Sequence, residues 1–187
     1  MNKKVKKEII EWVVIIGVLG GLYISGLHTE VIGLLQRGVL ATGIIQPDTN
    51  ETGATADYDL LLKDPNGNTI NLNEWKGEPI FLNFWATWCP PCIAEMPDID
   101  NLYKNVGDEV NFALISLDEN PEKAIEFIER KGFDTPIYFL ASSVPEAFQS
   151  RSIPTTFVIS PDGRIVVSNK GMAKYNTDDF RKFLMNL

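Results

Sequence analysis

Residues 80–92, with the sequence IFLNFWATWCPPC, join an apolar run to a pair of cysteines. The run from Ile80 to Ala86 is almost continuously apolar and aromatic, which is typical of a strand buried on both faces of a sheet. Cys89 and Cys92 follow directly, and Pro91 suits an early position in a helix. The stretch predicts a central strand that leads into a helix, with both cysteines at the junction.

The spacing of the two cysteines allows them to close a small disulfide ring. At the start of a helix, unpaired backbone N–H groups favour a thiolate, and in Cys-x-x-Cys motifs the thiol pKa falls from ~8.5 to ~3.5–7.5. Cys89 comes first and lies nearer the solvent end of the strand, so we expect it to be the attacking thiolate. Cys92 lies within the helix and is expected to resolve the mixed disulfide. The pattern indicates thiol–disulfide exchange and not a structural bridge.

The composition excludes several other classes of protein. The chain has 187 residues, with 17 Lys and Arg against 25 Asp and Glu, and its net charge is −8. An acidic domain without a basic stripe argues against nucleic-acid binding. Two cysteines are too few for a disulfide-stapled scaffold, and with a single histidine, His28, we expect no metal site. No cofactor is expected either, because the dithiol itself carries two electrons.

The N-terminal 30 residues have the pattern of a membrane anchor. An apolar run from Ile9 to Leu27, broken only by Glu11, is just long enough for one spanning helix. The basic residues before it favour the cytoplasmic side, so everything after Leu27 is expected to be extracytoplasmic; these residues are Lys3, Lys4, Lys6 and Lys7. The alternatives are a cleaved signal peptide, for which no good cleavage site follows the run, and a buried core helix.

Residues 31–56 are expected to connect this anchor to a domain at 57–187. Residues 31–45 form a second apolar stretch, interrupted by Gln36 and Arg37, which we interpret as a juxtamembrane segment on or near the bilayer. Residues 47–56 are polar and rich in turn-forming residues, as linkers are. His28 is expected to lie at the membrane interface without a catalytic role.

The domain shows an α/β pattern. Asn66-Gly67 marks a hairpin turn, Pro121 and Gly132 fit the start and the end of a helix, and Thr177 caps a last helix. This pattern predicts a mixed central sheet with helices on both faces and an N-terminal hairpin extension. Right-handed crossovers place the cysteine pair at the carboxyl edge of a central strand. The expected strands are 58–62, 69–72, 80–86, 110–117, 137–140, 155–159 and 165–167, and the expected helices are 93–103, 121–131 and 177–187.

The run from Phe84 to Cys92, together with Ile153-Pro154-Thr155, resembles the thioredoxin fold. More narrowly, residues 58–187 resemble the membrane-anchored TlpA/ResA-like thiol–disulfide oxidoreductases of bacterial cell envelopes. Besides the anchor and the hairpin, this narrower resemblance is carried by Asn73-Glu74-Trp75-Lys76-Gly77, Glu95-Met96-Pro97, and Asp162-Gly163 after Thr155-Thr156-Phe157.

The resemblance implies a client-binding surface around the cysteines. It implies a cis peptide bond before Pro154, through which the Ile153 backbone is presented to a client. Trp88 is implied to be a lid beside the thiol. Pro90 and Pro91, which stiffen the loop inside the motif, complete the expected substrate-binding residues.

One position departs from the thioredoxin pattern. Thioredoxins often carry a buried aspartate six residues before the first cysteine, where this chain has Asn83, which cannot relay a proton. ResA-like proteins have a glutamate tied to the active-site thiols at the position of Glu95. We therefore expect Glu95 to be catalytic, the alternative being a solvated helix charge. Asp118 and Glu119 are expected to form only a solvated turn.

By resemblance, the protein is expected to reduce disulfides of extracytoplasmic clients, for example apocytochrome c, with electrons from a membrane thiol carrier. The same motif is compatible with an oxidant of the same clients. A non-catalytic binding module with a thioredoxin fold is the alternative from another class. A peroxidase of the peroxiredoxin type is disfavoured because the chain lacks the Pro-x-x-x-Thr/Ser-x-x-Cys loop.

Overall fold

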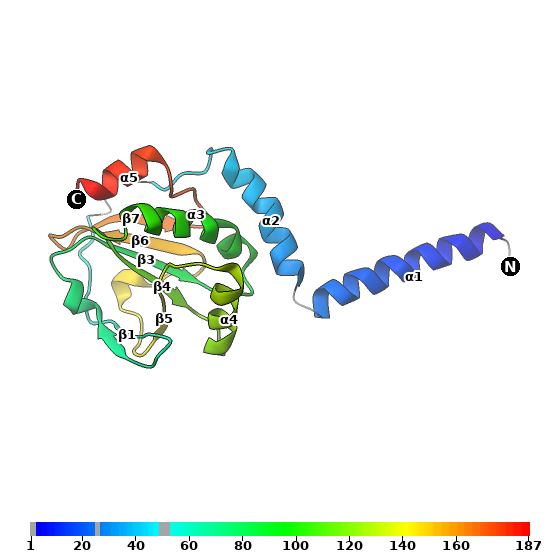
Figure 1. Ribbon diagram of the computed structural model, residues 1–187, viewed down its shortest axis with the longest axis horizontal. Helices are drawn as coiled ribbons and strands as arrows, with labels where there is room; N and C mark the ends of the chain where they lie inside the picture. Colours follow the sequence, from blue (N-terminus) through cyan, green and yellow to red (C-terminus); the bar gives the residue numbers. More distant parts are fainter. Residues whose placement is uncertain (1–2, 25–26, 49–52) are drawn as a thin grey trace.

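The computed structural model describes residues 3–24, 27–48 and 53–187, which contain one mixed sheet of seven strands in the order β2-β1-β5-β4-β3-β6-β7 (Figure 1). β3 pairs in parallel with β4, and β4 with β5, whereas the remaining pairs are antiparallel. The expected mixed sheet and N-terminal hairpin are confirmed. The strands are β1 (Leu61–Lys63), β2 (Thr69–Asn71), β3 (Ile80–Trp85), β4 (Asn111–Ser116), β5 (Ile137–Leu140), β6 (Thr155–Ile159) and β7 (Ile165–Lys170).

The helices follow the caps that the sequence provides. The side chain of Asn120 accepts from the Glu122 N–H at the start of one helix, and Gly132 ends it with φ of 65°. Thr177 caps the last helix by accepting from the Phe180 N–H. The α-helices are α1 (Lys3–Ile24), α2 (Leu27–Ala41), α3 (Pro90–Val106), α4 (Pro121–Lys131) and α5 (Asp178–Met185), with 3₁₀ turns η1 (Leu72–Trp75) and η2 (Glu146–Phe148).

The two faces of the sheet are covered by different kinds of structure. Phe81 and Leu114 belong to one core cluster with the apolar side chains of α3, α4 and α5. On the opposite face, Leu82 and Ile115 are covered by the extended segment around Leu60 and by η1 and η2. The expectation of helices on both faces is therefore wrong for the α-helices of the domain, which share one face.

The connections explain this arrangement. The crossovers β3-α3-β4 and β4-α4-β5 step in the same direction across the sheet. Right-handed crossovers that step in one direction place their helices on the same face. The pairing order of the strands, which local sequence patterns do not reveal, thus decides which face the helices cover.

The N-terminal helices differ in how they relate to the domain. α1 points away from it (Figure 1), and its apolar side chains, such as Trp12 and Ile16, are exposed. Within the described residues, no helix alone has the length and apolar character of a membrane span. Residues 5–24 of α1 and the whole of α2 meet those criteria together, as a pair bent by 92°.

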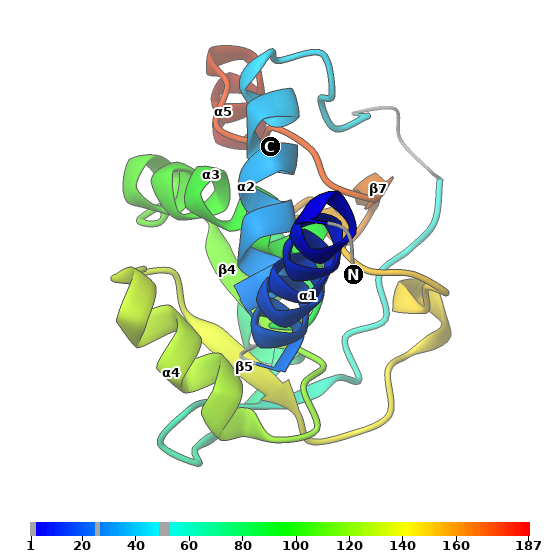
Figure 2. The ribbon, with the colours of Figure 1, turned by 90° about the vertical axis from the view of Figure 1, so that its right-hand side faces the viewer.

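α2 packs against the domain beside α3, and buries Thr29, Gly33 and Leu40. Figure 2 shows it crossing in front of the sheet, next to α3. The part of the chain interpreted as a juxtamembrane segment at 31–45 therefore contains a helix with one face on the domain. Residues 49–52 of the expected linker lie outside the described residues.

Candidate active site

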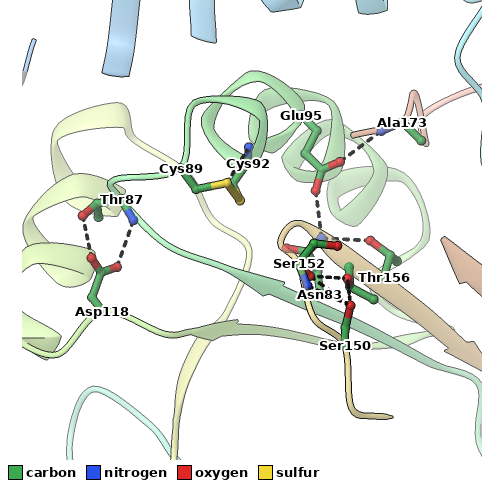
Figure 3. The surroundings of a disulfide bond; sticks show 11 residues. Asn83, Thr87, Cys89, Cys92, Glu95, Asp118, Ser150, Ser152, Thr156 and Ala173 are labelled. Atoms are coloured by element: carbon green, nitrogen blue, oxygen red, sulfur yellow. Dashed lines mark hydrogen bonds between the residues drawn. A yellow bond between two sulfur atoms is a disulfide. The ribbon is translucent and has the colours of Figure 1, made fainter. Parts of the chain in front are cut away.

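The cysteine pair lies between the carboxyl end of β3 and the start of α3, as expected. Cys89 is the residue before the helix, and its sulfur accepts a hydrogen bond from the Cys92 N–H at 3.3 Å. The two sulfurs form a disulfide with their Cα atoms 5.3 Å apart (Figure 3). Cys89 is 4% exposed and Cys92 fully buried, so the first cysteine is the one nearer to solvent.

The first turn of α3 has few backbone donors. Pro90 and Pro91 carry no N–H, so the first donors of the helix are those of Cys92 and Ile93. The Cys92 N–H points at the Cys89 sulfur, and the Ile93 N–H donates to the Cys89 carbonyl at 3.1 Å. A thiolate at Cys89 would thus meet one direct donor and the positive end of the helix dipole.

Three aromatic residues before the cysteines divide as expected between core and surface. Phe84 and Trp85 are buried in the two core clusters. Trp88 is 59% exposed and lies directly before Cys89. Its large apolar side chain is therefore available to a partner, and is not part of the core.

The segment before β6 lies at the same edge of the sheet. The Ile153–Pro154 peptide bond is cis, as the resemblance implies. A groove of about 660 Å³ opens beside it, and its lining includes Phe84, Leu117 and Ile153 together with the cationic side chains of Arg151 and Lys170. Because Phe84 belongs to β3, this groove lies next to the strand that leads to the cysteines.

Glu95 is fully buried, so the alternative of a solvated helix charge is wrong. Its carboxyl group accepts from the Asn83 side chain at 2.9 Å and from the Ala173 N–H at 3.1 Å (Figure 3). Burial raises the pKa of Glu95 to about 8, although both hydrogen bonds oppose the shift. Glu95 lies three residues after Cys92 on α3, hence on the same helix face. A buried acid that titrates near neutral pH therefore lies close to the second thiol.

A polar network beneath Glu95 could not be read from the sequence. The Asn83 amide also donates to the Thr156 hydroxyl at 2.9 Å, and that hydroxyl accepts from the Tyr175 hydroxyl at 2.7 Å. Burial raises the pKa of Tyr175 well above its usual value, so this phenol stays neutral. Asn83, in the position where thioredoxins carry an aspartate, therefore serves as a donor to Glu95.

Asp118 is buried and is not part of a solvated turn. One of its carboxylate oxygens accepts from the Thr87 N–H at 2.9 Å and the other from the Thr87 hydroxyl at 2.7 Å. Ser116 donates to the same carboxylate at 2.9 Å. Asp118 therefore ties the end of β4 to the loop that carries Trp88 and Cys89. The sequence did contain a signal for this contact, because Thr87 and Asp118 are polar residues that follow the adjacent parallel strands β3 and β4.

We expect the Asp118→Ala variant to lose about 2 kcal/mol of stability, because it leaves the Thr87 N–H without its acceptor in a partly buried loop. Urea denaturation of the oxidised protein measures this change. Glu119→Ala is the matched control, since Glu119 is exposed and its replacement should change stability by less than ~0.5 kcal/mol. Equal effects of the two substitutions would contradict the assigned role of Asp118.

The chain is similar in sequence to known proteins. The Redoxin family model matches residues 46–183 of the chain. The thiol-disulfide oxidoreductase ResA of Halalkalibacterium halodurans is 35% identical over 128 residues, which cover 66% of this chain and 72% of that protein. The chain belongs to the ResA/TlpA-like thiol–disulfide oxidoreductases. It is thus a member of the thioredoxin superfamily.

Two further relatives of this oxidoreductase extend the comparison. ResA of Bacillus subtilis is 35% identical over 108 residues, and the chain spans 60% of its length. A thiol:disulfide interchange protein from Chlorobium tepidum, known from a crystal structure, is 26% identical with a TM-score of 0.57 over 74% of this chain and 99% of that one. Both relatives agree with the observed thioredoxin-like fold.

Proposed function

We propose that this oxidoreductase is tethered to the cell membrane and reduces disulfides of extracytoplasmic proteins through Cys89 and Cys92. The Cys89 thiolate attacks one sulfur of a client disulfide, which forms a mixed disulfide and releases the first client thiolate. Cys92 then attacks the Cys89 sulfur, which closes the enzyme disulfide and releases the second client thiolate. The observation that carries this proposal is the Cys92 N–H aimed at the Cys89 sulfur at the start of α3.

Glu95 is proposed to move the proton of Cys92. The resolving thiol must lose a proton before it attacks, and a base with a pKa near the working pH performs this transfer best. Glu95, with its pKa raised to about 8, lies one helical turn from Cys92. Its burial keeps the proton exchange away from bulk water.

The client is proposed to lie across Trp88, the loop of Pro90 and Pro91, and the segment of Ile153 and Pro154. Trp88 is exposed directly before Cys89, and the groove at Ile153 is lined in part by Phe84 of β3, the strand that leads to Cys89. A polypeptide that passes over Cys89 meets the apolar Trp88 ring and the backbone before Pro154 at the same time.

The anchor is proposed to be α1, with the N-terminus in the cytoplasm and the domain outside. The exposed apolar side chains of α1, among them Trp12 and Ile16, would be covered by lipid, and the lysines before them match the positive-inside rule. A membrane thiol carrier on the outer side is then the proposed electron donor. This topology is tested with single cysteines placed in α4. If the domain lies outside, these cysteines should react in intact cells with a thiol reagent that does not cross the membrane.

Trapping tests the proposed exchange. In Cys92→Ser, the mixed disulfide between Cys89 and its client cannot be resolved, so a disulfide-linked complex should accumulate in intact cells. Mass spectrometry after non-reducing electrophoresis identifies the client, and the Cys89→Ser, Cys92→Ser double variant is the control. If the single variant yields no more linked protein than the double variant, the chain acts as a binding module and not as an exchange enzyme.

The direction of exchange follows from the potential of the dithiol. Equilibration of the oxidoreductase with glutathione measures this potential, and ~30 mV changes the equilibrium constant about tenfold for two electrons. A value near that of thioredoxin, about −270 mV, supports the reductant. A value near about −120 mV, where strong oxidants lie, means that the same cysteines oxidise the clients.

A further inference from the structure

The backbone of α2 lies close to the turn that carries the cysteines. A Cβ atom at Gly33 would lie 3.1 Å from the Pro90 carbonyl oxygen and 3.2 Å from Cγ2 of Ile93. Contacts this short are tighter than most Cβ contacts in proteins, so even a Cβ atom would require its neighbours to shift by a few tenths of an ångström, and a side chain as large as leucine would require more. Glycine at this position lets the backbone of α2 rest directly on the first turn of α3.

Two polar side chains hold α2 to the domain on either side of this point. The Arg37 guanidinium donates to the Ile93 carbonyl of α3 at 3.4 Å. The Glu30 carboxylate pairs with Arg130 at 2.6 Å and with Lys131 at 2.7 Å, both at the end of α4. α2 therefore contacts both helices that border the loop of Trp88.

The supported turn has few hydrogen-bond donors of its own. Pro90 and Pro91 provide no donors, and helix ends open more readily than helix centres. The Cys92 N–H and the Ile93 N–H, which organise this turn around Cys89, are adjacent to the contact with Gly33.

α2 leaves the client side open. A groove of about 700 Å³ lies between α2 and α4 and reaches Trp88, which remains exposed. The groove at Ile153 is lined by residues between 84 and 170 and receives none from α2. The position of α2 is therefore that of a support behind the dithiol, and not that of a lid over it. It also lies before residue 46, where the match to the Redoxin family begins.

We propose that α2 is a positioning element of the active site, in which Gly33 holds the first turn of α3 so that the Cys92 N–H stays aimed at the Cys89 sulfur. The inference rests on the proposed function, since it assumes that Cys89 is the attacking thiolate. Its consequence is that a contact made outside the Redoxin region raises the thiolate fraction of Cys89. It also makes the disulfide more oxidising, because the reduced form is stabilised.

Two glycines on α2 provide a matched experiment. Gly33→Leu and Gly38→Leu make the same substitution within one helix, with the same gain in helix propensity. A Cβ atom at Gly38 meets nothing within 4 Å, so only the variant at Gly33 disturbs the contact with α3. Both are made in the full chain that also carries Cys92→Ser, so that Cys89 is the only thiol. The rate of alkylation of Cys89 by iodoacetamide is measured from pH 5 to 10.

Gly33→Leu is expected to lower the alkylation rate at pH 7 by about threefold or more, and to move the pH midpoint of the rate upward. Gly38→Leu should match the parent in both respects. With both cysteines present, Gly33→Leu should also shift the glutathione equilibrium toward a more reducing disulfide. If Gly33→Leu leaves the alkylation rate of Cys89 unchanged, the proposal is wrong. If the rate increases, the proposal is also wrong, and α2 acts as a lid that restricts access to Cys89.

Circular dichroism reports whether Gly33→Leu is folded. If it is not, Glu30→Gln is a milder variant for the same test. It removes the ion pairs with Arg130 and Lys131 without adding volume, so the alkylation rate should fall in the same direction by a smaller factor. If Gly33→Leu is unfolded and the alkylation rate of Glu30→Gln equals that of the parent, the proposal fails. Alkylation needs no client. A missing client complex in the trapping experiment therefore counts against the proposed function alone, and equal alkylation rates count against the role of α2 alone.

Discussion

Replacement of Cys89 by serine is expected to lower the rate of disulfide reduction by at least about 10³-fold, to the level of the uncatalysed reaction. The nucleophile in exchange is the thiolate, and a serine hydroxyl in the same place does not ionise near neutral pH. The assay is the reduction of a model disulfide by the chain in its dithiol form, with the initial rate as the readout.

The comparison with Cys92→Ser gives this prediction its specificity. Cys92→Ser keeps the attacking thiol, so it should still capture one equivalent of a model disulfide in a single turnover, whereas Cys89→Ser should capture almost none. Reduced wild-type protein is the reference for folding, because both variants lack the disulfide. If Cys89→Ser retains a rate within tenfold of the wild type, the assignment of the attacking cysteine is wrong.

The second large effect is the pH dependence of stability, for which Glu95 is expected to be responsible. Its pKa is about 8 in the folded protein, against an ordinary value of 4.5. A carboxyl group whose pKa is raised on folding binds its proton more tightly in the folded state. The associated stability is fully present below pH ~4.5 and is lost as the pH rises to about 8. The total loss is on the order of 5 kcal/mol.

Glu95→Gln should remove this slope. The amide does not titrate, so residue 95 should no longer contribute to any change in the unfolding free energy between pH 5 and 9. Because the amide NH₂ must face one of the two donors at Asn83 and Ala173, we expect a constant cost of about 1–3 kcal/mol. The variant is then less stable than the wild type at pH 5 and more stable at pH 9.

Urea denaturation of the oxidised protein at several pH values measures both curves, and the disulfide prevents the cysteines from titrating. Glu129→Gln, on the exposed side of α4, is the control and should run parallel to the wild type. If the curves for Glu95→Gln and the wild type are parallel as well, the buried carboxyl does not titrate in this range, and its proposed part in proton transfer is wrong.

Much of the domain could be predicted because its signals are local. The bounds of α4, β5 and β6 agree with those expected from capping residues and apolar runs. The hairpin turn at Asn66-Gly67 and the strand that leads into Cys89 were equally readable. Each of these depends on residues that are neighbours in the chain, for which backbone propensities are informative.

The errors concern contacts between segments distant in the chain. Asp118 is hydrogen-bonded to Thr87, 31 positions away, and Arg37 to Ile93, 56 positions away. A solvated turn was a reasonable interpretation for Asp118, because its partner Thr87 is distant in the chain. Whether a polar residue is buried depends on such partners, because burial of an unpaired polar group costs free energy.

The sequence by itself placed the cysteine pair between a buried strand and a helix, because two cysteines with two residues between them after an apolar run are a local arrangement. It also determined the order of the strands and α-helices of the domain, and the bounds of α4, β5 and β6. Only the tertiary structure decided that the α-helices of the domain share one face, that Glu95 is buried on Asn83, and that Gly33 rests on the Pro90 carbonyl. These features set the electrostatic surroundings of the dithiol, and they depend on strand order and on close packing between distant segments.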